Sequence, residues 1–327
     1  MHGYAIMLNV NKYLEGKPML EFYKPLTFKD TINTDAINFP VDRVPVYGYR
    51  PHRDEYIKIP DKWEIVRTDN HASLGVVGSK YELDPYINHV TAVTQAVTEM
   101  IDTDQLDGYN AKADFKVYEG GRKMNLTIDF PNHTIEPQID DIVRFQFKDS
   151  DSYNQTWARR LNYQGFRLWC LNGCTTSAFN LGFYSKHTKS ISSDESIARM
   201  IRNMKVAVEA FKSDEQDFKK WATTHVERND VLGVFKKTLA SYENAKTGDT
   251  KVSDNKMKDL KISLQSNTNH LGWTVWAAYN AATEWASHLD RGVREVRGAE
   301  HNVVRSRQTD VAKMLRSNPW KEMAGTE

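Results

Sequence analysis

The hydrophobic periodicity of this 327-residue chain changes from mainly strand-like to helical near Ser193, and that change most constrains its fold. Before it, short runs rich in β-branched residues, such as 63–67 and 74–77, are separated by turn-forming residues, which is typical of a β-hairpin. After it, apolar residues recur every three to four positions, which is typical of amphipathic helices. The sequence therefore predicts an α+β protein, with an N-terminal antiparallel β-rich region followed by a helical C-terminal region.

One central helix interrupts the predicted strands. Apolar residues from Ile87 to Ile101 repeat at helical spacing, and Asp84 is placed to cap this helix. Two further strands flank Gly120-Gly121, a pair that closes hairpins because glycine tolerates positive φ. The strands predicted after the helix are 113–118, 124–130, 142–147 and 165–171.

The C-terminal third is predicted to contain several helices. Residues 242–258 are polar and predict an exposed connection, and a long last helix is expected from about Asn269 through Trp285. Trp273, Trp276 and Tyr279 have helical spacing, which favours a core or a subunit interface. The predicted divisions are an N-terminal arm or extra strands (1–59), a β-rich core domain (60–192) and a helical C-terminal domain (193–327).

Composition and charge narrow the function classes. Hydrophobic residues make up 40% of the chain and the formal charge is +1, so a folded protein without an overall attraction to nucleic acid is expected. The chain has two cysteines, which favours a reducing compartment. Neither a signal peptide nor an apolar run of membrane-spanning length is present. These features predict a cytoplasmic protein with no membrane contact.

Common enzyme motifs are absent from the sequence. It has no phosphate-binding Gly-Lys-Ser/Thr loop, no dinucleotide-binding glycine pattern and no His-Glu-x-x-His. Cys170, Cys174 and His187 supply only half of a usual zinc pattern, so buried thiols are favoured. No metal or cofactor is predicted, and non-catalytic binding is favoured over an enzyme. The acidic groups Asp102, Asp104, Asp107, Asp140 and Asp141 are interpreted as turn residues.

The stretch from Ser152 to Ser193 contains no Asp or Glu, and its cations are interleaved with aromatic residues. Phosphates attract cations and unpaired bases stack on exposed rings, so this composition indicates a groove for a single strand. An equally weighted alternative is that most of these rings form the buried face of a sheet. The candidate nucleic-acid-binding residues are Trp157, Arg159, Arg160, Tyr163, Arg167, Tyr184, Lys186 and Lys189.

Arginines also gather toward the C-terminus. A phosphate could use them, but interspersed Glu295 and Glu300 favour a salt-bridged surface helix. The arginines in question are Arg291, Arg294, Arg297, Arg305 and Arg307.

Several segments together resemble a known family, the phage and plasmid-like proteins classed as domain of unknown function 932. The first is an Arg-Thr-Asp hairpin, the second an Arg-x-x-Cys-x-Asn element, and the third a closing helix. The order of the segments agrees with the family over most of residues 60–320. The matching residues are Arg67-Thr68-Asp69 with Leu74-Gly75-Val76-Val77, then Arg167 to Gly173 with Lys186-His187-Thr188, and finally Thr274 to Trp285 with His288.

The resemblance implies a phage or mobile-element protein but attaches no activity to it. In outline, a β-hairpin sheet with one helix and a helical C-terminus is similar to the phage single-strand annealing proteins. The leading hypothesis is therefore a phage protein that binds and anneals single-stranded DNA in the host cytoplasm, as a homo-oligomeric ring or filament without a cofactor.

Two hypotheses from other classes stay open. One is a metal-dependent phage nuclease or other DNA-modifying enzyme, with Asp69, His71 and His187 as candidate residues. The other is a structural or host-interaction protein that binds a partner through its Trp-rich last helix.

Overall fold

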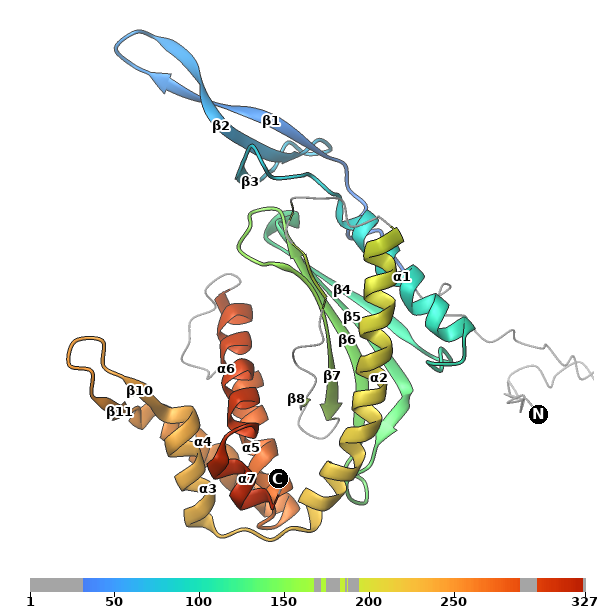
Figure 1. Ribbon diagram of the computed structural model, residues 1–327. Helices are drawn as coiled ribbons and strands as arrows, with labels where there is room; N and C mark the ends of the chain where they lie inside the picture. Colours follow the sequence, from blue (N-terminus) through green and yellow to red (C-terminus); the bar gives the residue numbers. More distant parts are fainter. Residues whose placement is uncertain are drawn as a thin grey trace, which may run out of the picture.

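The computed structural model describes residues 32–167, 172–174, 183–185, 187, 194–288 and 299–325 (Figure 1). Antiparallel strands with one helix fill the first part of the described chain and helices dominate the last, which confirms the predicted α+β class. The strands are β1 (Val41–Arg50), β2 (Glu55–Arg67), β3 (Ser73–Gly78), β4 (Lys112–Tyr118), β5 (Lys123–Ile135), β6 (Val143–Ser152), β7 (Arg159–Arg167), β8 (Asn172–Cys174), β9 (Phe183–Ser185), β10 (Ser241–Glu243) and β11 (Thr250–Val252). The α-helices are α1 (Tyr86–Asp102), α2 (Asp194–Thr223), α3 (Arg228–Phe235), α4 (Asp254–Leu271), α5 (Val275–Ser287), α6 (Ala299–Leu315) and α7 (Asn318–Ala324).

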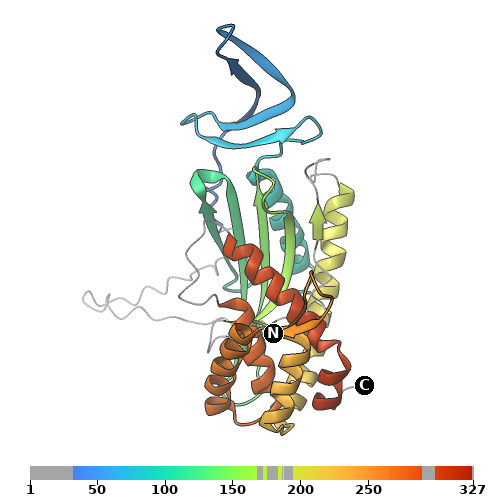
Figure 2. The ribbon, with the colours of Figure 1, turned by 90° about the vertical axis from the view of Figure 1, so that its left-hand side faces the viewer.

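The main sheet has the strand order β4-β5-β6-β7-β8, and β9 also pairs with β7. Helices α1 and α2 cover one face of this sheet, and α6 lies on its other side (Figures 1 and 2). Alternate residues of β6, such as Val143, Phe145 and Phe147, are buried beneath the helices. The Phe145 ring lies 5.1 Å from that of Phe211 on α2, so the core lies between sheet and helices.

A smaller sheet, β1-β2-β3, extends from one end of the main sheet (Figure 1). Pairing of β2 with β3 confirms the hairpin predicted from 63–67 and 74–77. The β1–β2 hairpin is longer and projects beyond β3, and it begins within the segment predicted to be an arm or extra strands. The boundary between the predicted arm (1–59) and the predicted core domain (60–192) falls inside β2, because this one strand pairs with both β1 and β3.

The turn between β4 and β5 has the predicted glycines, with φ of 68° at Gly120 and 112° at Gly121. The predicted cap of α1 is wrong. Pro85 occupies the N-cap position, where no side-chain hydrogen bond forms. The Asp84 carboxylate instead accepts hydrogen bonds from Asn88 and Arg159.

The last third differs from its prediction in one boundary. The predicted long helix is two helices, because Gly272 ends α4 with a φ of 71° and the Thr274 side chain caps α5. Trp276 and Tyr279 are fully buried, which confirms the core interpretation for these two rings. Residues 242–258, predicted as a connection, include part of the β10–β11 hairpin and the start of α4. In the described part of the chain, no helix has both the length and the apolar character needed to cross a membrane.

Gly75 lies where the two sheets touch. A Cβ added at Gly75 would stand 2.7 Å from the Asn154 Cα and 3.2 Å from the Tyr153 carbonyl oxygen, both in the turn region after β6. Backbone atoms cannot move aside as a side-chain end can. The small sheet therefore docks on the main sheet only if residue 75 has no side chain.

We expect Gly75→Ala to lower the free energy of unfolding by about 1–3 kcal/mol, because overpacking forces backbone shifts. Chemical denaturation of the purified variant measures this loss. Gly78→Ala is the matched control, since Gly78 is in the same strand and a Cβ there meets nothing within 4 Å. Equal stability of the two variants would contradict the docking role of Gly75.

Candidate nucleic-acid interface

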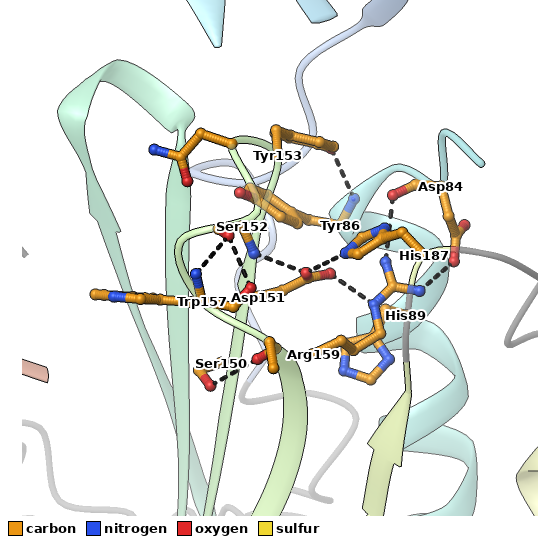
Figure 3. A network of polar contacts seen from close by, with 12 residues as sticks. Asp84, Tyr86, His89, Ser150, Asp151, Ser152, Tyr153, Trp157, Arg159 and His187 are labelled. Carbon is orange, nitrogen blue, oxygen red and sulfur yellow. Dashed lines mark hydrogen bonds and ion pairs between the residues drawn. The ribbon is translucent and has the colours of Figure 1, made fainter. Parts of the chain in front are cut away.

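Arg159 lies in a buried polar network where β6, β7 and α1 meet (Figure 3). Its Nε donates to Asp151 Oδ2 at 2.6 Å, and its Nη1 donates to Asp84 Oδ2 at 2.6 Å. Arg159 is 1% exposed. The expectation that it contacts a phosphate is therefore contradicted, because both carboxylates already hold its guanidinium away from solvent.

The same network contains two histidine–aspartate pairs. His187 Nε2 lies 2.6 Å from Asp151 Oδ1, and its ring stacks on Tyr81 with centroids 4.7 Å apart. His89 Nε2 lies 2.7 Å from Asp149 Oδ2, and neither side chain is exposed. All of these groups are packed inside the protein.

The pKa values of the two carboxylates shift in opposite directions. Burial raises the pKa of Asp149 above its ordinary value despite the neighbouring His89. At Asp151 burial acts in the same direction, but the charges of Arg159 and His187 outweigh it and hold the pKa well below the usual range. Asp151 is thus the ionised centre of the network.

The network joins elements that are distant in sequence. Tyr86 at the start of α1 donates its backbone N–H to the Tyr153 hydroxyl at 3.0 Å, and the Glu82 N–H donates to the His187 carbonyl at 2.8 Å. Because its histidines and carboxylates have almost no contact with solvent, this arrangement can fix α1 on the sheet but presents no open site to a substrate.

Arg167 is also structural. It is fully buried, and its Nε donates to Asp141 Oδ1 at 2.5 Å. The other carboxylate oxygen of Asp141 accepts from Trp276 Nε1 at 2.6 Å. Arg167 therefore links the end of β7 to α5, and the expectation that it binds phosphate is contradicted by its burial.

Two predicted base-stacking rings lie in the core. Trp157 is 4% exposed and meets the Tyr118 ring edge-on, while Tyr163 is 6% exposed and packs against Phe145. For Tyr163 the alternative interpretation, a buried sheet face, is the correct one, whereas Trp157 is buried in the turn between β6 and β7. The signal failed because aromatic residues serve cores and binding surfaces equally well.

Arg160 and Tyr184 do reach the surface. Tyr184 on β9 is 47% exposed, and the Arg160 guanidinium lies 4.8 Å from the centre of its ring. Partial burial and the positive charge of Arg305 lower the pKa of Arg160, and partial burial also lowers the pKa of Arg305. Among the described residues neither arginine forms an ion pair with an acid. The salt-bridged helix was expected largely from Arg291, Arg294, Glu295, Arg297 and Glu300, whose side chains lie outside the described part of the structure; farther along α6, Lys313 Nζ lies 3.8 Å from Asp310 Oδ1.

Strand register places further cations on the same face as Arg160. Arg160 pairs with Ser150, Ser150 with Asn125 and Asn125 with Lys116, so these side chains share the face away from α1 and α2. Sequence reasoning missed this face, although polar residues at alternate positions of 112–116 and 144–148 could have revealed it. We call it the basic sheet face, and its members are Lys112, Lys116, Arg144, Lys148, Arg160 and Tyr184, with Arg305 contributed by α6. Two acidic residues, Asp114 and Asp129, lie on the same face, and Asp129 forms an ion pair with Arg144 at 2.7 Å, so the cations outnumber the acids.

The remaining cationic candidates are not placed. Lys186 and Lys189 lie outside the described residues, as do Cys170 and the side chain of Cys174.

The residues considered for metal-dependent chemistry lie in two different settings. Asp69 forms an ion pair with Arg67, which also donates to the Gly120 carbonyl and so ties the small sheet to the β4–β5 turn. His71 adopts a φ of 57° in the same hairpin turn, whereas His187 belongs to the buried network. Within the described ranges, no three His, Cys, Asp or Glu side chains are grouped to hold a metal.

Comparison with known proteins identifies the family. Residues 73–316, more than half of the chain, match the family described as Domain of unknown function (DUF932). The chain belongs to the DUF932 family. Neither the curated proteins nor the solved structures include a match.

The geometry gives several of the family-like residues a structural role. In this DUF932 member, Arg67 and Gly75 join the two sheets, and Arg167 and Trp276 share Asp141. These family-like residues therefore contribute to the fold, and none of them lies on the basic sheet face.

Proposed function

We propose that this protein binds single-stranded DNA and promotes the annealing of complementary strands. One observation carries the proposal: the charges of Arg160 and Arg305 interact beside the exposed Tyr184 ring, and neither arginine forms an ion pair with an acid in the described part of the chain. Two guanidinium groups that repel each other are stabilised by a shared anion, and a phosphate supplies that charge. Tyr184 offers a stacking surface for an adjacent base.

The basic sheet face extends this contact along a strand. Lys112 and Lys116 on β4 and Lys148 on β6 are exposed on it, where each supplies a positive charge for a further phosphate. Annealing requires no covalent chemistry. The protein would neutralise the backbone of one strand and leave its bases free until a complementary strand pairs with them.

Assembly and setting form part of the proposal. Many weak phosphate contacts become tight when subunits line up on one strand, so a homo-oligomeric ring or filament is the expected form. We place this activity in a phage or mobile element, acting in the host cytoplasm. Docking through the Trp-rich helix has less support, because Trp276 and Trp285 are buried.

The test replaces both surface arginines. We expect Arg160→Ala with Arg305→Ala to weaken binding of a labelled unstructured oligonucleotide, measured by fluorescence anisotropy at several salt concentrations. Since each phosphate contact on a single strand contributes about 0.7 to the slope of log K against log salt, the slope should fall by roughly 1.4. Arg202→Ala with Arg228→Ala, two exposed arginines on α2 and α3, is the matched control.

Two results would count against the proposal. Unchanged affinity and slope in the Arg160/Arg305 variant would remove this site. A wild-type protein that binds no single strand at low salt, or that fails to accelerate strand pairing, would remove the function itself.

A further inference from the structure

The β1–β2 hairpin exposes aromatic rings that no packing requirement explains. Beyond β3 it consists of two strands alone and projects away from the body of the protein (Figures 1 and 2). Tyr47, Tyr49 and Tyr56 on this hairpin are 54%, 50% and 72% exposed. Isolated two-stranded hairpins are marginally stable, and large exposed rings on one mark an interaction surface.

These rings lie on a single face. Tyr47 pairs with Lys58 and Tyr49 pairs with Tyr56, so the four side chains point the same way. The Tyr49 and Tyr56 rings have centroids 5.0 Å apart. Toward the body of the protein the row continues, because Lys58 Nζ lies 5.0 Å from the centre of the Trp63 ring.

The row ends on a second cation. The Arg43 guanidinium lies 4.4 Å from the centre of the Trp63 ring, so that this ring contacts two positive charges. We call this set the aromatic ladder. It consists of Arg43, Tyr47, Tyr49, Tyr56, Lys58 and Trp63.

Two acidic residues of the hairpin lie on the face opposite Arg43 and Trp63. Asp42 and Glu64 occupy alternate positions to Arg43 and Trp63, which places them on the opposite face. At the tip, Asp54 accepts a hydrogen bond from the Tyr49 hydroxyl at 2.7 Å. The Arg43 guanidinium donates to the carbonyls of Tyr81 and Ser79, each at 3.1 Å, so Lys58 is the cation of the ladder that is placed to meet a phosphate. Rings beside a cation are the combination that suits bases joined by phosphates.

We infer that the aromatic ladder is a second contact for single-stranded nucleic acid, at which unpaired bases stack on Tyr47, Tyr49 and Tyr56. Lys58 neutralises an adjoining phosphate. This inference rests on the proposed function and adds a base-dependent contact to the phosphate-dependent one on the basic sheet face.

The experiment compares two strands of equal length, an oligothymidylate and an abasic strand that keeps the phosphates but lacks bases. We expect the triple variant Tyr47→Ala, Tyr49→Ala and Tyr56→Ala to lose at least about tenfold in affinity for the oligothymidylate, because stacking is lost. Its affinity for the abasic strand should not change. The corresponding triple Tyr→Phe variant should bind like the wild type, since it keeps the rings.

Matched controls separate this contact from general effects. Tyr109→Ala with Tyr242→Ala removes two rings of similar exposure outside the hairpin and should leave both affinities unchanged. The Arg160/Arg305 variant should lose affinity for both strands. Photocrosslinking of a 5-iodouracil strand, followed by peptide mapping, should recover the 47–56 segment.

The possible failures are distinguishable. If the wild type binds neither strand, the proposed function and the ladder contact both fail. If it binds the oligothymidylate and the triple alanine variant binds equally well, only the ladder contact is overturned. A triple variant that changes its sedimentation without DNA and keeps its affinity would show that the ladder contacts a second copy of the chain instead.

Discussion

Arg159→Ala is expected to lower the free energy of unfolding by about 3–5 kcal/mol, because it leaves two buried carboxylates without their cation. Asp151 is fully buried and Asp84 nearly so, and Arg159 contacts both at 2.6 Å. Urea or guanidinium titration followed by circular dichroism measures the loss. Arg159→Lys should fall between wild type and alanine, because an ammonium group keeps the charge but not the two-pronged geometry.

The control for this prediction is Lys219→Ala, which removes the cation of an exposed ion pair with Glu215. Such pairs contribute about 0.3–0.5 kcal/mol. If Arg159→Ala lowered the free energy of unfolding only as much as Lys219→Ala does, the buried network would not stabilise the fold. Under conditions where Arg159→Ala stays folded, unchanged affinity for a single strand is expected, and a selective loss of affinity would restore Arg159 to the binding surface.

Asp141→Ala is the second prediction with a large effect, again about 3–5 kcal/mol of unfolding free energy. This carboxylate is 1% exposed and accepts hydrogen bonds from both Arg167 and Trp276. The substitution leaves the buried guanidinium of Arg167 without its carboxylate and removes a contact between the sheet and α5. Thermal and chemical denaturation should both show the change.

Asp114→Ala provides the comparison, since Asp114 is exposed on β4. Surface substitutions of this kind stay within about 0.5 kcal/mol. Trp276→Phe tests the same contact from the other side, because it keeps a ring and removes only the Nε1–H donor. If Asp141→Ala were as stable as Asp114→Ala, the link between β7 and α5 would contribute nothing to the free energy of unfolding.

The sequence predicted the elements whose patterns are local. The spacing from Ile87 to Ile101 corresponds to α1, and Gly120-Gly121 forms the turn between β4 and β5. Features that depend on tertiary contacts were harder to predict from the sequence. Asp84 looks like a cap in sequence, but Arg159, 75 residues later, binds its carboxylate.

The candidate site was predicted only in part, for a physical reason. An arginine in an acid-free stretch has no local partner, but folding supplied Asp84 and Asp151 to Arg159 and Asp141 to Arg167. Arg160, one residue from Arg159, points to the opposite face and remains a surface cation. Which arginine is buried depends on strand register, and composition does not contain that information.

The sequence by itself determined the α+β class, the order of strands and helices, and membership in the DUF932 family, because these depend on residue spacing along the chain. Only the tertiary structure decided which cations are paired and which rings are exposed. Those properties depend on neighbours that are distant in sequence: Arg305 reaches Arg160 from α6, and the rings of β1 and β2 share a face through their pairing. The surfaces we propose for single-stranded DNA follow from those long-range contacts.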